Sequence, residues 1–137
     1  MNDKIHMVIV IKQGIAPEYA VVGAAHASLA CYLRWGSDNL TNKWANEVFH
    51  KHIKMANVDQ FEKAKDNKYG DKIVITESNL GGEEVAIVYR IQEEYPKFIN
   101  TLPKWKFIEI EESGKEPWNQ PNEEGEWPGD ICCLRSA

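Results

Sequence analysis

A single histidine is the most suggestive candidate for chemistry in this sequence. His26 is the only strongly polar, titratable side chain in the middle of residues 21–32, a stretch of mostly small and apolar side chains. An imidazole with an ordinary pKa of about 6.5 exchanges its proton near neutral pH, so His26 could act as a general base. The alternative is a helix histidine whose ring only fixes local packing. The residues alone leave both interpretations open.

Two further charged residues stand at the ends of apolar runs. Glu77 ends the run at 72–77, and Lys12 ends the run at 6–12. Ligands of open α/β sheets bind beyond the carboxyl ends of the strands. Glu77 could therefore orient His26 or activate a water there, and Lys12 could contact a phosphate or stabilise negative charge. The simpler alternatives are a solvated carboxylate for Glu77 and a snorkelling lysine for Lys12.

The elements that must position these residues can be predicted from the apolar pattern. Strands are predicted at 6–12, 50–56, 72–77 and 85–91, and helices at 18–35 and 92–102. A helix across 40–48 is indicated by Leu40, Trp44 and Val48, which recur at i, i+4 and i+8. Another helix begins at a cap, Asn57 or Asp59, and ends near 70.

This order of elements, β-α-α-β-α-β-β-α, predicts an α/β fold. We expect a three-layer sandwich in which a four-stranded mixed sheet carries helices on both faces. The strands at 72–77 and 85–91 should pair antiparallel across the loop at 78–83, and the helical crossovers imply parallel neighbours elsewhere.

Charge divides the chain into two parts. Residues 1–108 hold 14 Lys and Arg against 13 Asp and Glu, whereas residues 109–137 hold two against eight. We therefore predict one domain over 1–110 and an acidic tail over 111–137, whose Trp118 and Trp127 suggest a contact with the body or with a protein partner. A net charge of −5 argues against a high-affinity, non-specific nucleic-acid binder, although it leaves room for a local basic face.

A basic face is indicated by six lysines in the middle of the chain. Tyr19, placed at the mouth of any cleft, could stack on a base, or it could simply fill space. Lys51, Lys54 and Lys65 are the candidate RNA contacts among the six, because phosphate contacts dominate nucleic-acid affinity. The alternative is an ordinary solvated surface. The six lysines are Lys51, Lys54, Lys63, Lys65, Lys68 and Lys72.

The sequence indicates neither a metal nor an organic cofactor. His50 and His52 share one face of a predicted strand, but no third ligand converges on them. Cys132 and Cys133 form no disulfide framework and have no assigned role. No apolar run approaches the roughly 20 residues that span a bilayer, so we expect a cytoplasmic protein without a membrane partner. Whether the chain forms a homodimer is left open by the sequence.

Several motifs resemble the type II peptidyl-tRNA hydrolase superfamily over roughly residues 5–110. His26-Ala27 matches the end of that family's first helix motif, Gly-Lys-x-x-Ala-Gln-x-x-His-Ala. The strand-loop-strand of 72–91 and the closing stretch 95–107 are similar to the family's later elements. The resemblance implies the family's fold. It also implies hydrolysis of the ester between a peptide and tRNA, with no cofactor.

The sequence departs from that family at its catalytic positions. Tyr19 stands where the family has lysine, and Gly23 stands where it has glutamine. The family's Asp-Ala-Gly-x-Thr-Gln is replaced by residues 77–82, so Glu77 is the nearest carboxylate, and Glu84 or Val85 stands where a threonine usually begins the last strand. Such a divergent branch has two candidate functions. One is ester hydrolysis by His26, Glu77 and Lys12, and the other is a non-catalytic RNA- or protein-binding module.

Overall fold

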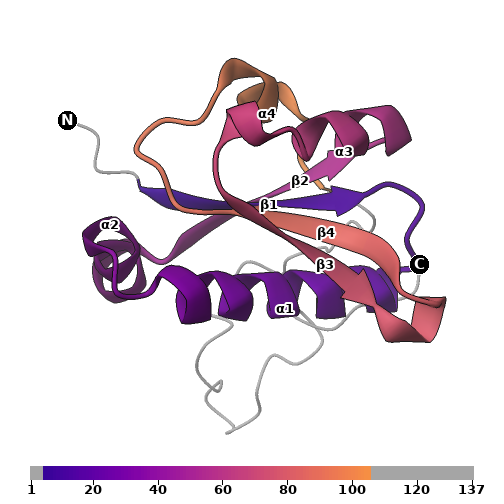
Figure 1. The fold of residues 1–137 in the computed structure, drawn as a ribbon, viewed down its shortest axis with the longest axis horizontal. Helices are drawn as coiled ribbons and strands as arrows, with labels where there is room; N and C mark the ends of the chain where they lie inside the picture. Colours follow the sequence, from indigo (N-terminus) through magenta and orange to yellow (C-terminus); the bar gives the residue numbers. More distant parts are fainter. Residues whose placement is uncertain (1–4, 106–137) are drawn as a thin grey trace, which may run out of the picture. The chain divides into compact units, whose positions relative to one another are not determined.

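The computed structural model describes residues 5–105, which form a four-stranded sheet and its covering helices (Figure 1). The strands are β1 (His6–Lys12), β2 (His50–Ala56), β3 (Lys72–Glu77) and β4 (Glu83–Tyr89). The α-helices are α1 (Pro17–Trp35), α2 (Asn39–Lys43), α3 (Val58–Ala64) and α4 (Lys97–Thr101). A π-helical turn, η1 (Trp44–Val48), follows α2, and two short 3₁₀ turns are η2 (Asn67–Tyr69) and η3 (Ser78–Leu80).

The sheet is mixed, with strand order β2-β1-β4-β3. β1 pairs parallel with β2 and antiparallel with β4, and β3 pairs antiparallel with β4. The near-continuous apolar run of β1 suits this central place, because a strand covered on both faces has no polar side to offer. The α/β class, the mixed four-stranded sheet and the antiparallel β3–β4 pair agree with the sequence-based prediction.

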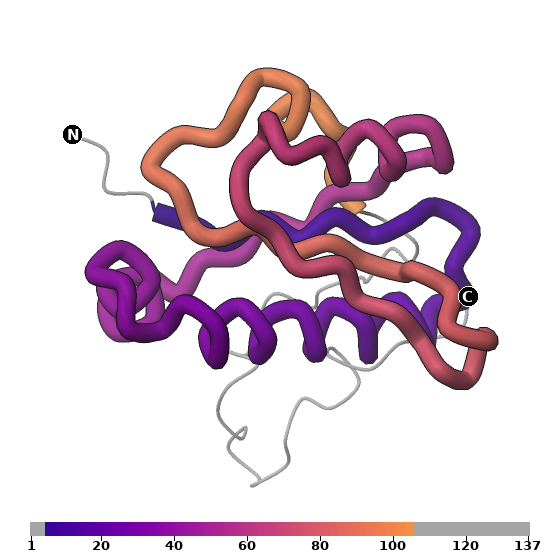
Figure 2. The backbone as a smooth tube through the Cα atoms, viewed as in Figure 1, coloured from indigo at the N-terminus to yellow at the C-terminus, as the bar shows by residue number. Residues whose placement is uncertain are grey.

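Alternation along β1 divides the core between the two faces of the sheet. Met7, Ile9 and Ile11 pack in the cluster that contains the buried residues of α1. Val8 and Val10 pack in the cluster that contains residues of α3 and α4. Figures 1 and 2 show α1 on one side of the sheet and α3 with α4 on the other. Because of this alternation, a charged side chain at the end of a strand faces either the layer of α1 or the layer of α3 and α4.

The structure corrects several predicted boundaries. The last strand covers 83–89 rather than 85–91, and it holds one extra residue where Ile75 pairs with Ala86 but Thr76 pairs with Glu84. The last helix begins only after Pro96 and is much shorter than 92–102. The helix that follows Asn57 ends at Ala64, and a separate 3₁₀ turn, η2, precedes the glycine at 70.

Of the two predicted caps of α3, Asn57 is confirmed, whereas Asp59 lies in the first turn of the helix. The Asn57 side chain accepts a hydrogen bond from the backbone N–H of Gln60, and the Gln60 side chain accepts one from the backbone N–H of Asn57, at 2.8 and 2.9 Å. Predictions that concern residues 106–137, including the acidic tail and Cys132-Cys133, lie outside the described residues. Within residues 5–105, no helix combines the length and apolarity that crossing a membrane requires.

Candidate functional site: two grooves beside strand β2

The three candidate catalytic residues lie in separate surroundings. The His26 side chain is exposed on α1 and makes no hydrogen bond or ion pair with another described residue. Glu77 is only 6% exposed at the end of β3, where its carboxylate accepts a hydrogen bond from the backbone N–H of Asn79 at 3.1 Å. This bond caps the turn that follows Glu77, so local structure already accounts for the buried carboxylate.

Lys12 belongs to the opposite layer from His26. Its ammonium lies 3.6 Å from the Glu83 carboxylate and 5.2 Å from the centroid of the Phe61 ring, which is part of α3. Within residues 5–105, no hydrogen bond or ion pair joins any two of His26, Glu77 and Lys12. Tyr19, the predicted base-stacking residue, is half-buried in the first turns of α1.

The six predicted basic-face lysines fall into two groups. Lys65 is held between Glu84 and Glu62, with Nζ–O distances of 2.7 and 3.0 Å, and these hydrogen bonds raise its pKa. Its charge is therefore compensated within the protein. Lys63, Lys68 and Lys72 place their ammonium groups over the rings of Phe98, Tyr69 and Tyr89. Lys51 and Lys54 lie apart from these four, on β2.

A groove of about 480 Å³, the β2 edge groove, runs along the outer edge of β2. It forms because residues 103–105 pair with the side of β2 that faces away from β1. The backbone N–H of Met55 donates to the carbonyl of Pro103, and that of Trp105 donates to the carbonyl of Ile53, at 2.8 and 2.9 Å. The groove is lined by Lys51, His52, Ile53, Lys54, Lys104 and Trp105.

Positive charge in the β2 edge groove is not compensated by the residues that the structure describes. Within residues 5–105, none of the lining residues is a carboxylate, and none of the three lysines forms an ion pair. Lys54 donates only to the backbone carbonyls of Asn100 and Leu102, each at 3.3 Å. Partial desolvation of the exposed His52 ring, and then the neighbouring positive charges, lower the pKa of His52. The groove is therefore suited to an anion.

Sequence reasoning identified Lys51 and Lys54 but not Lys104 or Trp105. The stretch at 105–108 was predicted only to close the core, and the half-buried Trp105 does pack against the cluster beneath α1. The available signal was Pro103, which favours an extended conformation for Leu102 before it and so marks the end of α4. Lys104, which follows Pro103, is brought beside β2 only by its tertiary pairing with Lys54.

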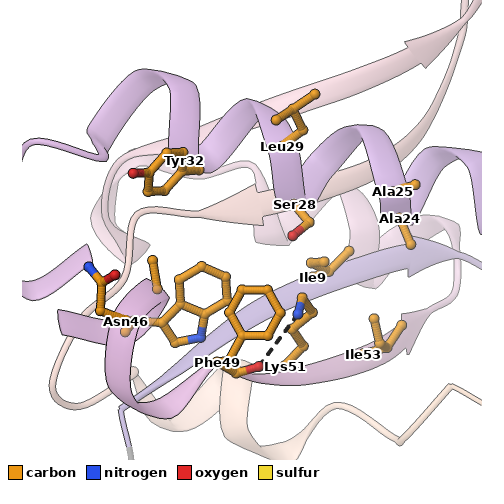
Figure 3. Close-up of a pocket in the computed structure, with 12 residues that line it drawn as sticks. Ile9, Ala24, Ala25, Ser28, Leu29, Tyr32, Asn46, Phe49, Lys51 and Ile53 are labelled. Atoms are coloured by element: carbon orange, nitrogen blue, oxygen red, sulfur yellow. Dashed lines mark hydrogen bonds between the residues drawn. The ribbon is translucent and has the colours of Figure 1, made fainter. Parts of the chain in front are cut away.

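A second groove, the α1–β2 groove, lies between α1, η1 and β2 and shares Lys51 and Ile53 with the β2 edge groove (Figure 3). Its volume is about 690 Å³. The turn that shapes it ends at Phe49, the only non-glycine described residue with a positive φ, at 60°. The Trp44 indole N–H donates to the carbonyl of His50 at 2.7 Å, and the Phe49 ring stacks on that indole at a centroid distance of 5.0 Å. This turn holds Phe49 at the surface. The sequence-based prediction of a strand at 50–56 gave no indication of such a turn.

Histidines also gather at the first residues of β2. The rings of His6 and His52 stack with centroids 3.8 Å apart, and His50, Glu93 and Glu94 line the same hollow. Nevertheless, no group of three His, Cys, Asp or Glu side chains within residues 5–105 has a geometry that could hold a metal ion.

Comparison with known proteins adds no functional assignment. No protein-family model matches the sequence, and no curated protein is significantly similar to it. The two grooves and their charges are therefore the features that point to a function.

Proposed function

We propose that the chain is a non-catalytic RNA-binding module and that the β2 edge groove holds RNA phosphates. The observation that carries this proposal is the gathering of three lysines and a histidine in one groove, where no carboxylate of residues 5–105 lines the wall. Lysine ammonium groups bind phosphates as mobile point charges, and such contacts supply most of the affinity for nucleic acids.

The surroundings of the groove favour RNA over a simple anion. Trp105 lies in the groove itself, and the exposed Phe49 ring lies close by, with the Lys51 ammonium 3.6 Å from its centroid. Proteins that bind single-stranded nucleic acids combine cations along the backbone with aromatic rings on which bases stack. The resemblance to type II peptidyl-tRNA hydrolases makes tRNA the first RNA to test.

Hydrolysis of peptidyl-tRNA has less structural support than binding. A general base must reach the water or hydroxyl that it activates, either directly or through one water. His26 and Lys12 belong to opposite helical layers, and Glu77 caps its own turn. A catalytic role for these three residues would require them to lie around one reacting group. Within residues 5–105, no hydrogen bond or ion pair joins any two of them.

The proposal is tested by the binding of fluorescently labelled tRNA, measured by anisotropy. Lys54→Gln/Lys104→Gln removes two positive charges from the groove but keeps hydrogen-bond donors. The control, Lys63→Gln/Lys68→Gln, removes two charges from exposed lysines elsewhere. We expect weaker binding in the first variant and near-normal binding in the second. Equal affinities in both variants would contradict the proposed site.

The same protein should release no N-blocked aminoacyl group from tRNA above background. Release that disappears in His26→Ala, with folding intact by circular dichroism, would favour the hydrolase instead. Binding without release would support the non-catalytic module.

A further inference from the structure

Large apolar side chains are exposed together along the α1–β2 groove. Leu29, Tyr32 and Phe49 are 59%, 42% and 60% exposed, and all three line this groove. Scattered exposed apolar residues are normal on a protein surface, but a contiguous group in a hollow indicates a binding site. Small side chains on α1, Ala24 and Ala25, leave the hollow open between the helix and β2.

A single charge accompanies this apolar surface. Among the twelve described residues that line the groove, Lys51 is the only charged one. Its ammonium lies over the Phe49 ring, 5.2 Å from the centroid of the Trp44 ring, and donates to the Phe49 carbonyl at 3.4 Å. Within residues 5–105 its partners are therefore two aromatic rings and one neutral oxygen. Burial lowers the pKa of Lys51, because the ammonium is incompletely hydrated there. A ligand that brings a negative charge would offset this desolvation.

We propose that the α1–β2 groove binds a small organic anion with a flat apolar body, such as an aryl carboxylate. The carboxylate would pair with Lys51, and the ring system would lie between α1 and the rings of Phe49 and Trp44. Figure 3 shows the Ser28 side chain extending from α1 toward this space, where its hydroxyl is available as a second polar contact. This ligand site goes beyond the proposed RNA binding, although the two grooves share Lys51 and Ile53.

Size and charge select this ligand over other occupants. Sites for small molecules typically measure about 300–1,000 Å³, with mostly apolar walls and a few placed polar groups, and this groove fits that range. A second copy that packed through its own α1 would bring a helix whose sole carboxylate is Glu18, in the first turn. Such a contact would bury Lys51 without a counter-charge, which is costly.

The experiment compares three ligands that share one ring system: naphthoate, naphthalenemethanol and naphthylmethylamine. Calorimetry on the full-length protein should give naphthoate an affinity about tenfold or more above that of the alcohol, as expected for a hydrogen bond between charged groups. The amine should bind most weakly. Equal affinities for naphthoate and the alcohol, tighter binding of the amine, or no binding of naphthoate would overturn the proposal.

Two variants test whether Lys51 is the charge that favours naphthoate over the alcohol. Lys51→Met keeps the aliphatic stem, so naphthoate should bind only as well as the alcohol does, while the alcohol is unaffected. Lys54→Met, whose side chain does not line this groove, should leave both affinities unchanged. If Lys51→Met does not fold, the comparison of naphthoate, the alcohol and the amine on the unmodified protein still tests whether the groove prefers an anion.

Analytical ultracentrifugation tests whether a second copy of the chain occupies the groove instead. A dimer that Leu29→Glu dissociates, in a protein that does not bind naphthoate, would assign the groove to an interface between copies and overturn the ligand proposal.

Discussion

The salt dependence of RNA binding gives a quantitative test of the β2 edge groove. The groove contains three lysines, Lys51, Lys54 and Lys104, and none of them is paired with a carboxylate within the described residues. If each lysine contacts one phosphate of a single strand, the slope of log affinity against log salt should be about −2. Raising salt from about 50 to about 200 mM should then weaken binding roughly 18-fold.

The double variant changes this slope by a calculable amount. Lys54→Gln/Lys104→Gln leaves one of the three contacts, so the slope should fall to about −0.7 and the same salt step should cost only about threefold. Lys63→Gln/Lys68→Gln should keep the original slope, because these exposed lysines lie outside the groove. The assay is anisotropy of a labelled uridine oligonucleotide at constant pH across a salt series. An unchanged slope in the groove variant, or a reduced slope in the control, would refute the reasoning.

Three other predictions concern the fold itself. A Cβ on Gly23 would lie 3.0 Å from Cγ2 of the fully buried Val85. Gly23→Val should therefore lower the free energy of unfolding by about 1–3 kcal/mol relative to Ala25→Val on the exposed side of the helix, and equal urea midpoints would contradict this packing. Burial raises the pKa of the Cys31 thiol to about 11, so iodoacetamide at about pH 8 should modify Cys31 only in denaturant; peptide mass spectrometry that finds equally fast labelling in native buffer would argue against the buried site. Partial desolvation and neighbouring positive charges lower the pKa of His52. The unfolded chain then binds the proton more readily, so the free energy of unfolding should rise with pH between the lowered pKa and about 6.5. His52→Asn should flatten that part of a profile of urea midpoints against pH, and an unaltered profile would count against this explanation.

The arrangement of the sheet was predictable from the sequence because its signals are local. The apolar run of β1 identified a central strand, and the candidate caps Asn57 and Asp59 indicated where α3 begins, with Asn57 as the cap that the structure shows. The short loop predicted at 78–83 identified the antiparallel pair β3–β4. These features depend on residues that are close in the chain, so pattern and capping rules apply directly.

The grouping of the charged residues was less predictable. Lys12 follows Ile11 along β1, so alternation turns it away from the layer that contains α1. That conclusion requires knowing which face α1 covers, and the residue pattern of β1 is apolar on both faces. Lys104 joins the β2 edge groove through pairing with a strand about fifty residues earlier, which no local pattern indicates.

The turn at Phe49 was missed for a different reason. The apolar spacing of Leu40, Trp44 and Val48 predicts an ordinary helix, but the chain there makes a π turn and ends in a left-handed residue. Such conformations are costly for a phenylalanine and persist only when the surroundings hold them. The stacked Trp44 indole and the indole hydrogen bond to the carbonyl of His50 provide that support.

The most direct test of the RNA-binding account is a map of the amide signals that shift when RNA is added. Two-dimensional ¹⁵N–¹H spectra of the labelled protein, titrated with an unlabelled uridine oligonucleotide, provide this map. The account predicts the largest shifts at residues 51–54 and 104–105, with α3 little affected. Shifts concentrated on α3 and η2, or no shifts at an RNA concentration that saturates anisotropy, would contradict the assignment of RNA binding to the β2 edge groove.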